Sequence, residues 1–259
     1  MNQIIGTTAT THVKRKKFQG ALYILSFNRH FYFLGVGALV LFVGAYSFFH
    51  WPTYILVIGL IAFVYGLLAP LVVSAYVYDF SGYYDLEWLD KLIKNTGAKK
   101  LMININAGFD ETSHLLERKY PNAEIRAFDF YDAKKHTELA IVRARKVNLV
   151  YPNTLPMTSS AIPLPDHSAD VILLLSSAHE IRSHEEKIRL FQECHRICKT
   201  DGQLIMIEHL RDFPNFIAFH IGFFHFFSAS TWKDAIQKGG FSKCETGRFT
   251  PFMGTFRCE

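Results

Sequence analysis

Small and titratable side chains follow two apolar runs in the second half of the chain. The first run, 171–175, leads into Ser176, Ser177, His179 and Glu180, and the second, 203–207, leads into Glu208 and His209. Apolar runs of this length between turn signals are typical of buried parallel strands. Ligands of open α/β sheets bind beyond the carboxyl ends of the strands, so we expect both groups to converge at one edge. Either His179 or His209 could take a proton from a phenol or similar hydroxyl. The alternative is that the histidine only forms hydrogen bonds and lines the site.

Strand and helix patterns alternate from residue 99 onward. We expect parallel strands at 101–105, 124–128, 171–175 and 203–207, a weak one at 147–150, and helices at 111–119, 134–146, 185–199 and 231–238. The last segment, 241–257, is predicted to form two strands joined by a turn at 251–254. The fold class is therefore α/β, a Rossmann-like doubly wound, mostly parallel sheet with a C-terminal antiparallel strand pair.

An uncharged apolar stretch precedes this domain. Residues 31–78 contain no Asp, Glu, Lys or Arg, which is more than twice the roughly 20 residues that one bilayer crossing needs. We expect helices at 31–49 and 53–77, with Pro70 kinking the second. A cleaved signal peptide is excluded because the run starts late and continues too long. A helical pair buried in a soluble fold is the alternative.

The charges around this stretch predict its orientation. Lys14, Arg15, Lys16, Lys17 and Arg29 precede the first helix, and no basic residue lies in the turn at 50–52. The positive-inside rule then places the amino terminus and the catalytic domain in the cytoplasm, in a multi-pass protein of the inner (cytoplasmic) membrane. These residues carry as much charge as the formal net charge of +5. The excess of positive charge thus reflects the orientation of the chain in the membrane, and we expect no nucleic-acid partner.

Four divisions follow from these patterns. They are a basic cytoplasmic segment at 1–28, a transmembrane helical hairpin at 29–78, an interfacial linker helix at 79–98 and the catalytic domain at 99–259. The linker reads as an aromatic belt that leads into an amphipathic helix near the lipid headgroups. The alternative is that Tyr78 and Asp79 reach into the ligand pocket. The aromatic-rich segment 213–227, with His220 and His225, should roof an apolar pocket or lie on the membrane.

The chain has four cysteines, and two of them, Cys194 and Cys198, share one face of a predicted helix. We expect buried, reduced thiols and no metal site, because no second Cys/His pair has the spacing of zinc ligands.

The middle of the chain resembles a known family. The stretch IPLPDHSADVILLLSSAHEI at 162–181, followed by EEKIRLFQECHRICKTDGQLIMIEHL at 185–210, is similar to the centre of class I S-adenosylmethionine-dependent methyltransferases, including those of quinone biosynthesis. The shared pattern is a Leu-Pro-x-x-Asp turn, a strand start and a helix end, here Lys199, Thr200, Asp201 and Gly202. The resemblance covers about residues 95–259 and leaves the hairpin outside.

The resemblance implies S-adenosyl-L-methionine as the cofactor. The family has an acid and then alternating glycines after the first strand, where this chain has Asn104, Asn106, Gly108 and Asp110. Only Gly108 keeps the pattern. Asp129 stands where the family's carboxylate accepts both ribose hydroxyls, and Ser176 and Ser177 should face the cofactor.

Methyl transfer from a sulfonium needs alignment, and a base if the acceptor is protonated. We therefore expect a membrane-anchored methyltransferase acting on a hydrophobic small molecule or lipid-like substrate, by O-methylation of an aromatic or polyene hydroxyl. His179 and His209 are the candidate bases, and Glu180, Glu208, His220 and His225 should line the substrate pocket. A degenerate, membrane-tethered scaffold is the alternative that the altered glycine loop suggests. A dinucleotide-dependent dehydrogenase ranks last because the glycine-rich turn is missing. The sequence leaves the oligomeric state open.

Overall fold

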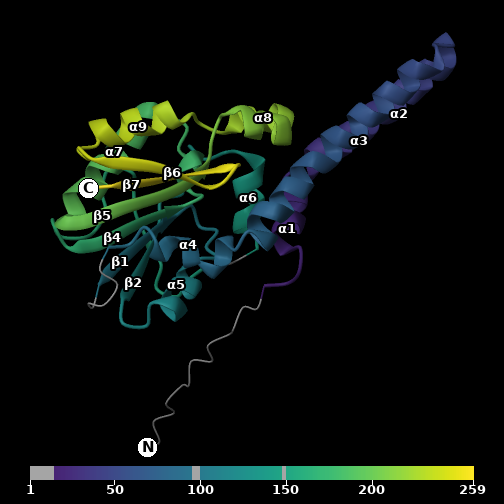
Figure 1. The fold of residues 1–259 in the computed structure, drawn as a ribbon. Coiled ribbons are helices and arrows are strands. Elements are labelled where there is room, and N and C mark those ends of the chain that lie inside the picture. Colours follow the sequence, from purple (N-terminus) through teal and green to yellow (C-terminus); the bar gives the residue numbers. More distant parts are fainter. Residues whose placement is uncertain (1–14, 95–99, 148–149) are drawn as a thin grey trace, which may run out of the picture.

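The computed structural model describes residues 15–94, 100–147 and 150–259, and its centre is one seven-stranded sheet (Figure 1). The strands are β1 Leu101–Asn106, β2 Glu124–Asp129, β3 Leu155–Pro156, β4 Ala169–Leu175, β5 Cys198–His209, β6 Cys244–Thr250 and β7 Met253–Cys258. They lie in the order β3-β2-β1-β4-β5-β7-β6. The first five strands pair in parallel, whereas β7 runs antiparallel to β5 and β6. The predicted sheet, including its C-terminal antiparallel pair, is confirmed.

Helices cover both faces of the sheet, which makes the fold doubly wound. Helices α6 Leu139–Arg145, α7 His184–Ile197 and α9 Ala229–Lys238 pack on the face that presents Ile103 and Phe128. The short helices α4 Glu87–Asp90 and α5 Ser113–Lys119 cover the opposite face with Val171 and Ile207. Because both faces are buried, the central strands read as continuous apolar runs rather than alternating ones.

The third strand differs from the prediction. The segment 147–150 was expected to be a strand, but the third strand is Leu155–Pro156, where Leu155 pairs with Phe128. Residues 148 and 149 lie outside the described part. A turn closed by the bond from the Thr154 amide to the Tyr151 carbonyl precedes the strand, so the chain reaches the sheet edge only after it.

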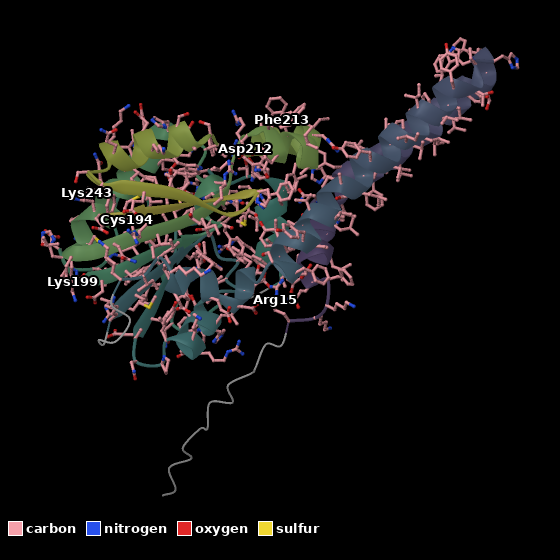
Figure 2. The ribbon with its side chains drawn as sticks, viewed as in Figure 1. Arg15, Cys194, Lys199, Asp212, Phe213 and Lys243 are labelled. Carbon is pink, nitrogen blue, oxygen red and sulfur yellow. A yellow bond between two sulfur atoms is a disulfide. The ribbon has the colours of Figure 1, made fainter. Side chains whose placement is uncertain are left out.

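Two long apolar helices project from the domain as an antiparallel pair (Figure 1). They are α2 Arg29–Phe49 and α3 Thr53–Ala75, joined by residues 50–52, and the apolar span of each is not buried in the described structure. A helix of 21 residues is about 31 Å long, close to the thickness of a bilayer core of about 30 Å. Figure 2 shows their side chains pointing outward along the whole hairpin. Length and composition suit a membrane crossing, which stays a proposal.

The segment after the hairpin is not the amphipathic helix that we expected at 79–98. The chain passes through a π-helical turn, η1 Tyr76–Phe80, a 3-10 turn, η2 Tyr83–Asp85, and α4, and it is described as far as residue 94. Leu86 interrupts the helix with a left-handed backbone (φ 57°). Trp88 is buried in the core rather than exposed to headgroups. Burying the Trp88 ring against the sheet is more favourable in free energy than placing it at a membrane interface.

A short helix that the sequence did not suggest, α1 Gln19–Phe27, docks the hairpin onto the domain. Asp79 accepts hydrogen bonds from the amides of Gly20 (2.8 Å) and Ala21 (3.1 Å) and so caps its first turn. At its other end Arg143 donates to the Phe27 carbonyl. Residues 1–14 of the predicted basic segment lie outside the described residues.

The cysteines behave as expected only in part. Cys194 and Cys198 are free and buried, as expected. They do not share a helix face, however, because α7 ends at Ile197 and Cys198 begins β5. Cys244 and Cys258 instead form a disulfide between β6 and β7, where the strand register places them opposite each other. The expectation of reduced thiols is therefore wrong for this second pair, because strand pairing brought together two residues far apart in sequence.

Candidate active site

The loop after β1 is held by its own polar side chains. Asp110 accepts hydrogen bonds from the amides of Thr112 and Ser113, both at 2.9 Å, at the start of α5. Asn104 donates to Thr112 (2.9 Å) and Ser113 (2.8 Å), and Asn106 accepts from the Gly108 amide at 2.7 Å. The residues that replace the family's acid and glycines therefore bind one another and shape the loop.

Gly108 and Asp129 face each other at the carboxyl ends of β1 and β2. Gly108 has φ +80°, a left-handed backbone that favours glycine. A Cβ atom at this position would lie 2.7 Å from the Asp129 carboxylate. The space is now taken by Arg145, whose guanidinium donates to Asp129 and to the Ala107 carbonyl, both at 2.7 Å. Sequence reasoning missed Arg145, because nothing in its spacing separates it from the other basic residues of its helix.

A second buried carboxylate, Glu111, adjoins this loop. It accepts hydrogen bonds from Arg15, Gln19 (3.1 Å) and Tyr84 (2.5 Å). Burial raises the pKa of Glu111, and the positive charge of Arg15 partly opposes that rise. The cluster joins residues from three separate segments, so no local pattern indicated it.

The two serines after β4 lie where the sequence predicted, at the same strand edge. Ser177 donates to the Ile105 carbonyl at 2.7 Å and thereby ties the end of β4 to β1. Ser176 has a left-handed backbone (φ 55°) and accepts a hydrogen bond from the Tyr83 hydroxyl at 3.1 Å.

His179 forms a part-buried ionic pair with the buried Glu208 across the ends of β4 and β5. Its Nδ1 lies 2.7 Å from one Glu208 oxygen, and its backbone amide donates to the other at 3.2 Å. On the opposite side of the ring, Nε2 lies 3.5 Å from Glu180 Oε1. Burial alone would lower the pKa of His179, but the Glu208 and Glu180 carboxylates together hold it well above the usual value. The predicted convergence of the two strand ends is therefore present.

His209 lies in a separate network. Its Nδ1 faces two acceptors, the Phe252 carbonyl (3.1 Å) and the Asn215 side-chain oxygen (3.2 Å), so this nitrogen carries the proton. Nε2 consequently accepts the hydrogen bond from the Tyr78 hydroxyl at 3.0 Å. Burial lowers the pKa of His209 to about 4, which keeps the ring neutral. Tyr78 thus reaches the sheet edge, as the alternative reading proposed, whereas Asp79 caps α1.

The lid segment, which we define as residues 213–227, brings only one of its histidines to His179. It contains α8 Phe213–Phe219 and the 3-10 turn η4 His220–His225. The ring centres of His225 and His179 lie 5.0 Å apart, and His225 Nδ1 lies 2.8 Å from Glu138. His220 packs instead on Tyr65 of α3, with ring centres 4.7 Å apart.

An apolar groove of about 640 Å³ runs between α3 and the lid segment. It is lined by Leu60, Ile61, Val64, Tyr65, Leu68, Ala69, Val72, Val73, Ile217, Ala218 and Phe252. The carbonyl of Phe252 is the one that His209 binds, so the groove ends beside the His209 network. Figure 2 shows Phe213 and Asp212 at the start of α8, on the side of the domain where the hairpin leaves it.

Comparison with known proteins identifies the domain. Residues 104–206 match the family model described as a methyltransferase domain. A demethylmenaquinone methyltransferase from Thermotoga maritima is 27% identical over 151 residues, which are 57% of this chain and 60% of the relative. Residues 104–206 are therefore a methyltransferase domain, and the matches support the class I S-adenosylmethionine-dependent type. Its cofactor is S-adenosyl-L-methionine, and the chain spans 60% of the length of the curated relative that it matches.

Two solved structures share the fold of this methyltransferase domain. Human N-acetylserotonin methyltransferase in complex with SAM aligns with a TM-score of 0.53 and 15% identity, covering 93% of this chain and 70% of the other. Geranyl diphosphate C-methyltransferase from Streptomyces coelicolor aligns with a TM-score of 0.50 and 10% identity, covering 73% and 81%.

Proposed function

We propose that the protein is a membrane-anchored S-adenosylmethionine-dependent methyltransferase that acts on a hydrophobic small molecule or lipid-like substrate. The observation that carries this proposal is the apolar groove between α3 and the lid segment, because it joins the hairpin to the strand edge of the methyltransferase domain. A substrate dissolved in the bilayer could enter such a groove without crossing water. The expected acceptor is the hydroxyl of an aromatic or polyene compound.

The loop and strand ends fit the cofactor. Gly108 leaves a space that a Cβ would fill, and the carboxylate of Asp129 borders that space. Asp129 accepts the ribose hydroxyls once Arg145 moves away, and the positive φ of Gly108 allows the backbone to approach the ligand closely. Bound S-adenosylmethionine supplies an activated methyl group on a neutral leaving group. Ser176 and Ser177 fix the strand end beside it.

His179 is the proposed proton acceptor, because Glu208 orients its ring at the same edge. The ring must first release the proton that Glu208 and Glu180 stabilise on it, and the neutral imidazole then accepts the proton of the hydroxyl. His209 is less suited, since its unprotonated nitrogen already accepts the Tyr78 hydroxyl. We therefore assign His209 to the wall of the site. Replacing His179 with Ala should lower kcat while the Kd of S-adenosylmethionine stays unchanged.

Glu180 and His225 lie close to His179, whereas His220 lies on the hairpin side of the lid segment. We propose that the first two face the acceptor and that His220 contacts the substrate on its way from the groove.

The test uses the full chain purified in detergent micelles, with methyl-tritiated S-adenosylmethionine and a total lipid extract as acceptor. Radioactivity is expected in the organic phase, and heating the protein beforehand should abolish it. Label recovered only in water-soluble products would overturn the substrate class. The absence of any heat of binding for S-adenosylmethionine or S-adenosylhomocysteine at millimolar ligand would instead favour the alternative of a membrane-tethered scaffold. Asn106 and Asp110 in the altered loop are the reason for considering that alternative.

The same protein tests the anchor. Alkaline carbonate extraction of cells that express the full chain should leave it in the membrane pellet, and a variant lacking residues 31–77 should be released. If the full chain were extracted as readily as that variant, the hairpin would not be an anchor.

A further inference from the structure

Three potential metal ligands meet where the lid segment touches the sheet edge. His179, Glu180 and His225 each offer one nitrogen or oxygen atom, and these atoms all lie within 4.8 Å of one another. His179 and Glu180 come from the 3-10 turn η3 Ala178–Glu180 after β4, and His225 ends the turn η4 of the lid segment. Two imidazoles and a carboxylate are a common donor set for zinc and for other divalent transition metals.

Both histidines are held by further carboxylates. Glu208 binds His179 Nδ1 at 2.7 Å, and Glu138 lies 2.8 Å from His225 Nδ1. These bonds occupy Nδ1 of each ring and leave Nε2 available for a metal ion. Nε2 of His179 faces Glu180. Metal-binding histidines almost always use their second nitrogen in this way, because the outer carboxylate fixes the ring and raises its basicity.

Glu180 supplies an independent sign of a missing partner. The residue is only 7% exposed, yet its Oε2 atom is buried with no hydrogen-bond partner in the described structure. A buried carboxylate oxygen without a partner costs free energy, and a cation bound between the rings would satisfy it. The three carboxylates around the two rings also provide the negative charge that a divalent ion requires.

We propose that His179, Glu180 and His225 bind one divalent transition metal ion, with Zn²⁺ as the expected ion and a fourth position left open. On binding, the metal replaces any proton held on the ligand nitrogens, and these protons pass to solvent. The ion links η3 of the sheet edge to η4 of the lid segment, so it fixes the lid over the site. This binding does not depend on the proposed function.

The catalytic consequence does rest on the proposed function. A metal ion at His179 Nε2 binds the lone pair of that nitrogen. His179 can then no longer take the proton from the hydroxyl of the substrate. A hydroxyl bound at the open position is acidified by the ion instead, and its proton leaves to solvent. Activity that rises on metal addition and is lost on chelation fits the metal route, whereas activity unchanged by chelation leaves the imidazole as the base. H179A lowers activity by either route.

The test measures Zn²⁺ binding to the full chain, purified in detergent without a polyhistidine tag and stripped with a chelator. Competition with a chromophoric chelator should show one tight site in the absence of S-adenosylmethionine. Glu180→Gln and His225→Ala should abolish it, and Glu208→Gln, which alters only the outer partner, should weaken it by about 10–100-fold. Substitution with Co²⁺ should give the visible absorption bands of a four-coordinate site in the native chain and not in His225→Ala.

Two matched variants control for folding and surface binding. His184→Ala removes a histidine that pairs with Asp234 at 2.8 Å on the exposed start of α7, and Glu185→Gln neutralises an exposed carboxylate nearby. Both should keep the tight site. Hydrogen exchange of 220–227 should slow on Zn²⁺ addition in the native chain and in these controls only.

Zn²⁺ binding that is equal in Glu180→Gln, His225→Ala and His184→Ala would overturn the proposal, as would the lack of any tight site in the native chain. Because each readout omits the methyl donor, a failure of the proposed methyltransferase activity would leave these results unaffected.

Discussion

The guanidinium of Arg145 lies 2.7 Å from the carboxylate of Asp129, in the space that Gly108 leaves open. Arg145 also stacks over the Tyr131 ring, with its central carbon 4.0 Å from the ring centre. The free domain thus satisfies its strand-end carboxylate with an internal cation. In the role proposed for Asp129, cofactor binding exchanges that cation for two ribose hydroxyls.

Asp129→Ala should weaken S-adenosylmethionine binding. The expected loss is about 1–3 kcal/mol, or about 5- to 150-fold in Kd, because a part-buried carboxylate that accepts hydrogen bonds is removed. Isothermal titration calorimetry of the full chain measures it. Asp201→Ala, at the exposed opposite end of β5, is the control and should bind as the native chain does. An unchanged Kd in Asp129→Ala would exclude the ribose role.

Arg145→Ala should act in the opposite direction. It removes the group that competes for Asp129, and a partly exposed ion pair is worth about 0–1 kcal/mol, so affinity should rise by up to about fivefold. Arg126→Ala breaks an exposed pair with Glu124 on β2 and should leave the Kd unchanged. Weaker binding in Arg145→Ala would mean that the guanidinium contacts the cofactor rather than competing with it.

Leu68→Phe should obstruct the apolar groove from the α3 side. A misfit of one methylene in an apolar pocket is worth about 1–3 kcal/mol, so kcat/KM for an apolar acceptor should fall by about 10-fold or more while the Kd of S-adenosylmethionine stays constant. Leu41→Phe places the same change on α2, away from the groove, where the side chain is exposed. Equal activity of the two variants would show that the acceptor does not use the groove.

Acid should destabilise the domain through His209. Its pKa in the folded state is about 4, below the ordinary 6.5, so between these values the unfolded chain binds more protons and stability falls as pH is lowered. The full effect, reached below pH 4 or so, is about 3 kcal/mol. Denaturant unfolding followed by Trp fluorescence at pH 7 and pH 4.5 should show less pH dependence in His209→Gln than in the native chain. His184→Gln, whose ring is exposed, should retain the native dependence, and an equal dependence in all three proteins would argue against a neutral buried His209.

The sheet could be predicted because its central strands are buried on both faces and each is followed by a polar break. The short third strand could not, since two residues on an edge leave no apolar pattern. The strand-end positions of Ser177, His179 and Glu208 followed from that same sheet topology. Trp88 was assigned to the interface because sequence alone does not say whether an aromatic ring meets lipid or a sheet face.

Partners that come from distant segments remained hidden. Glu111 is held by Arg15 and Tyr84, and His225 lies beside Glu138, and neither set shares a local spacing. The same limit explains the disulfide, because Cys244 and Cys258 meet only through the antiparallel register of β6 and β7. Long-range pairs of this kind need the fold before they can be found.

Arg15 forms ion pairs with two carboxylates, Asp79 at 3.5 Å and Glu111. The first belongs to the segment that continues the second apolar helix, and the second adjoins the loop after β1. Figure 2 places Arg15 where the described chain first reaches the domain. One side chain therefore ties the tilt of the hairpin to the shape of the cofactor loop. With the hairpin in a bilayer, as proposed, this link would hold the active edge at a fixed height and orientation above the membrane surface.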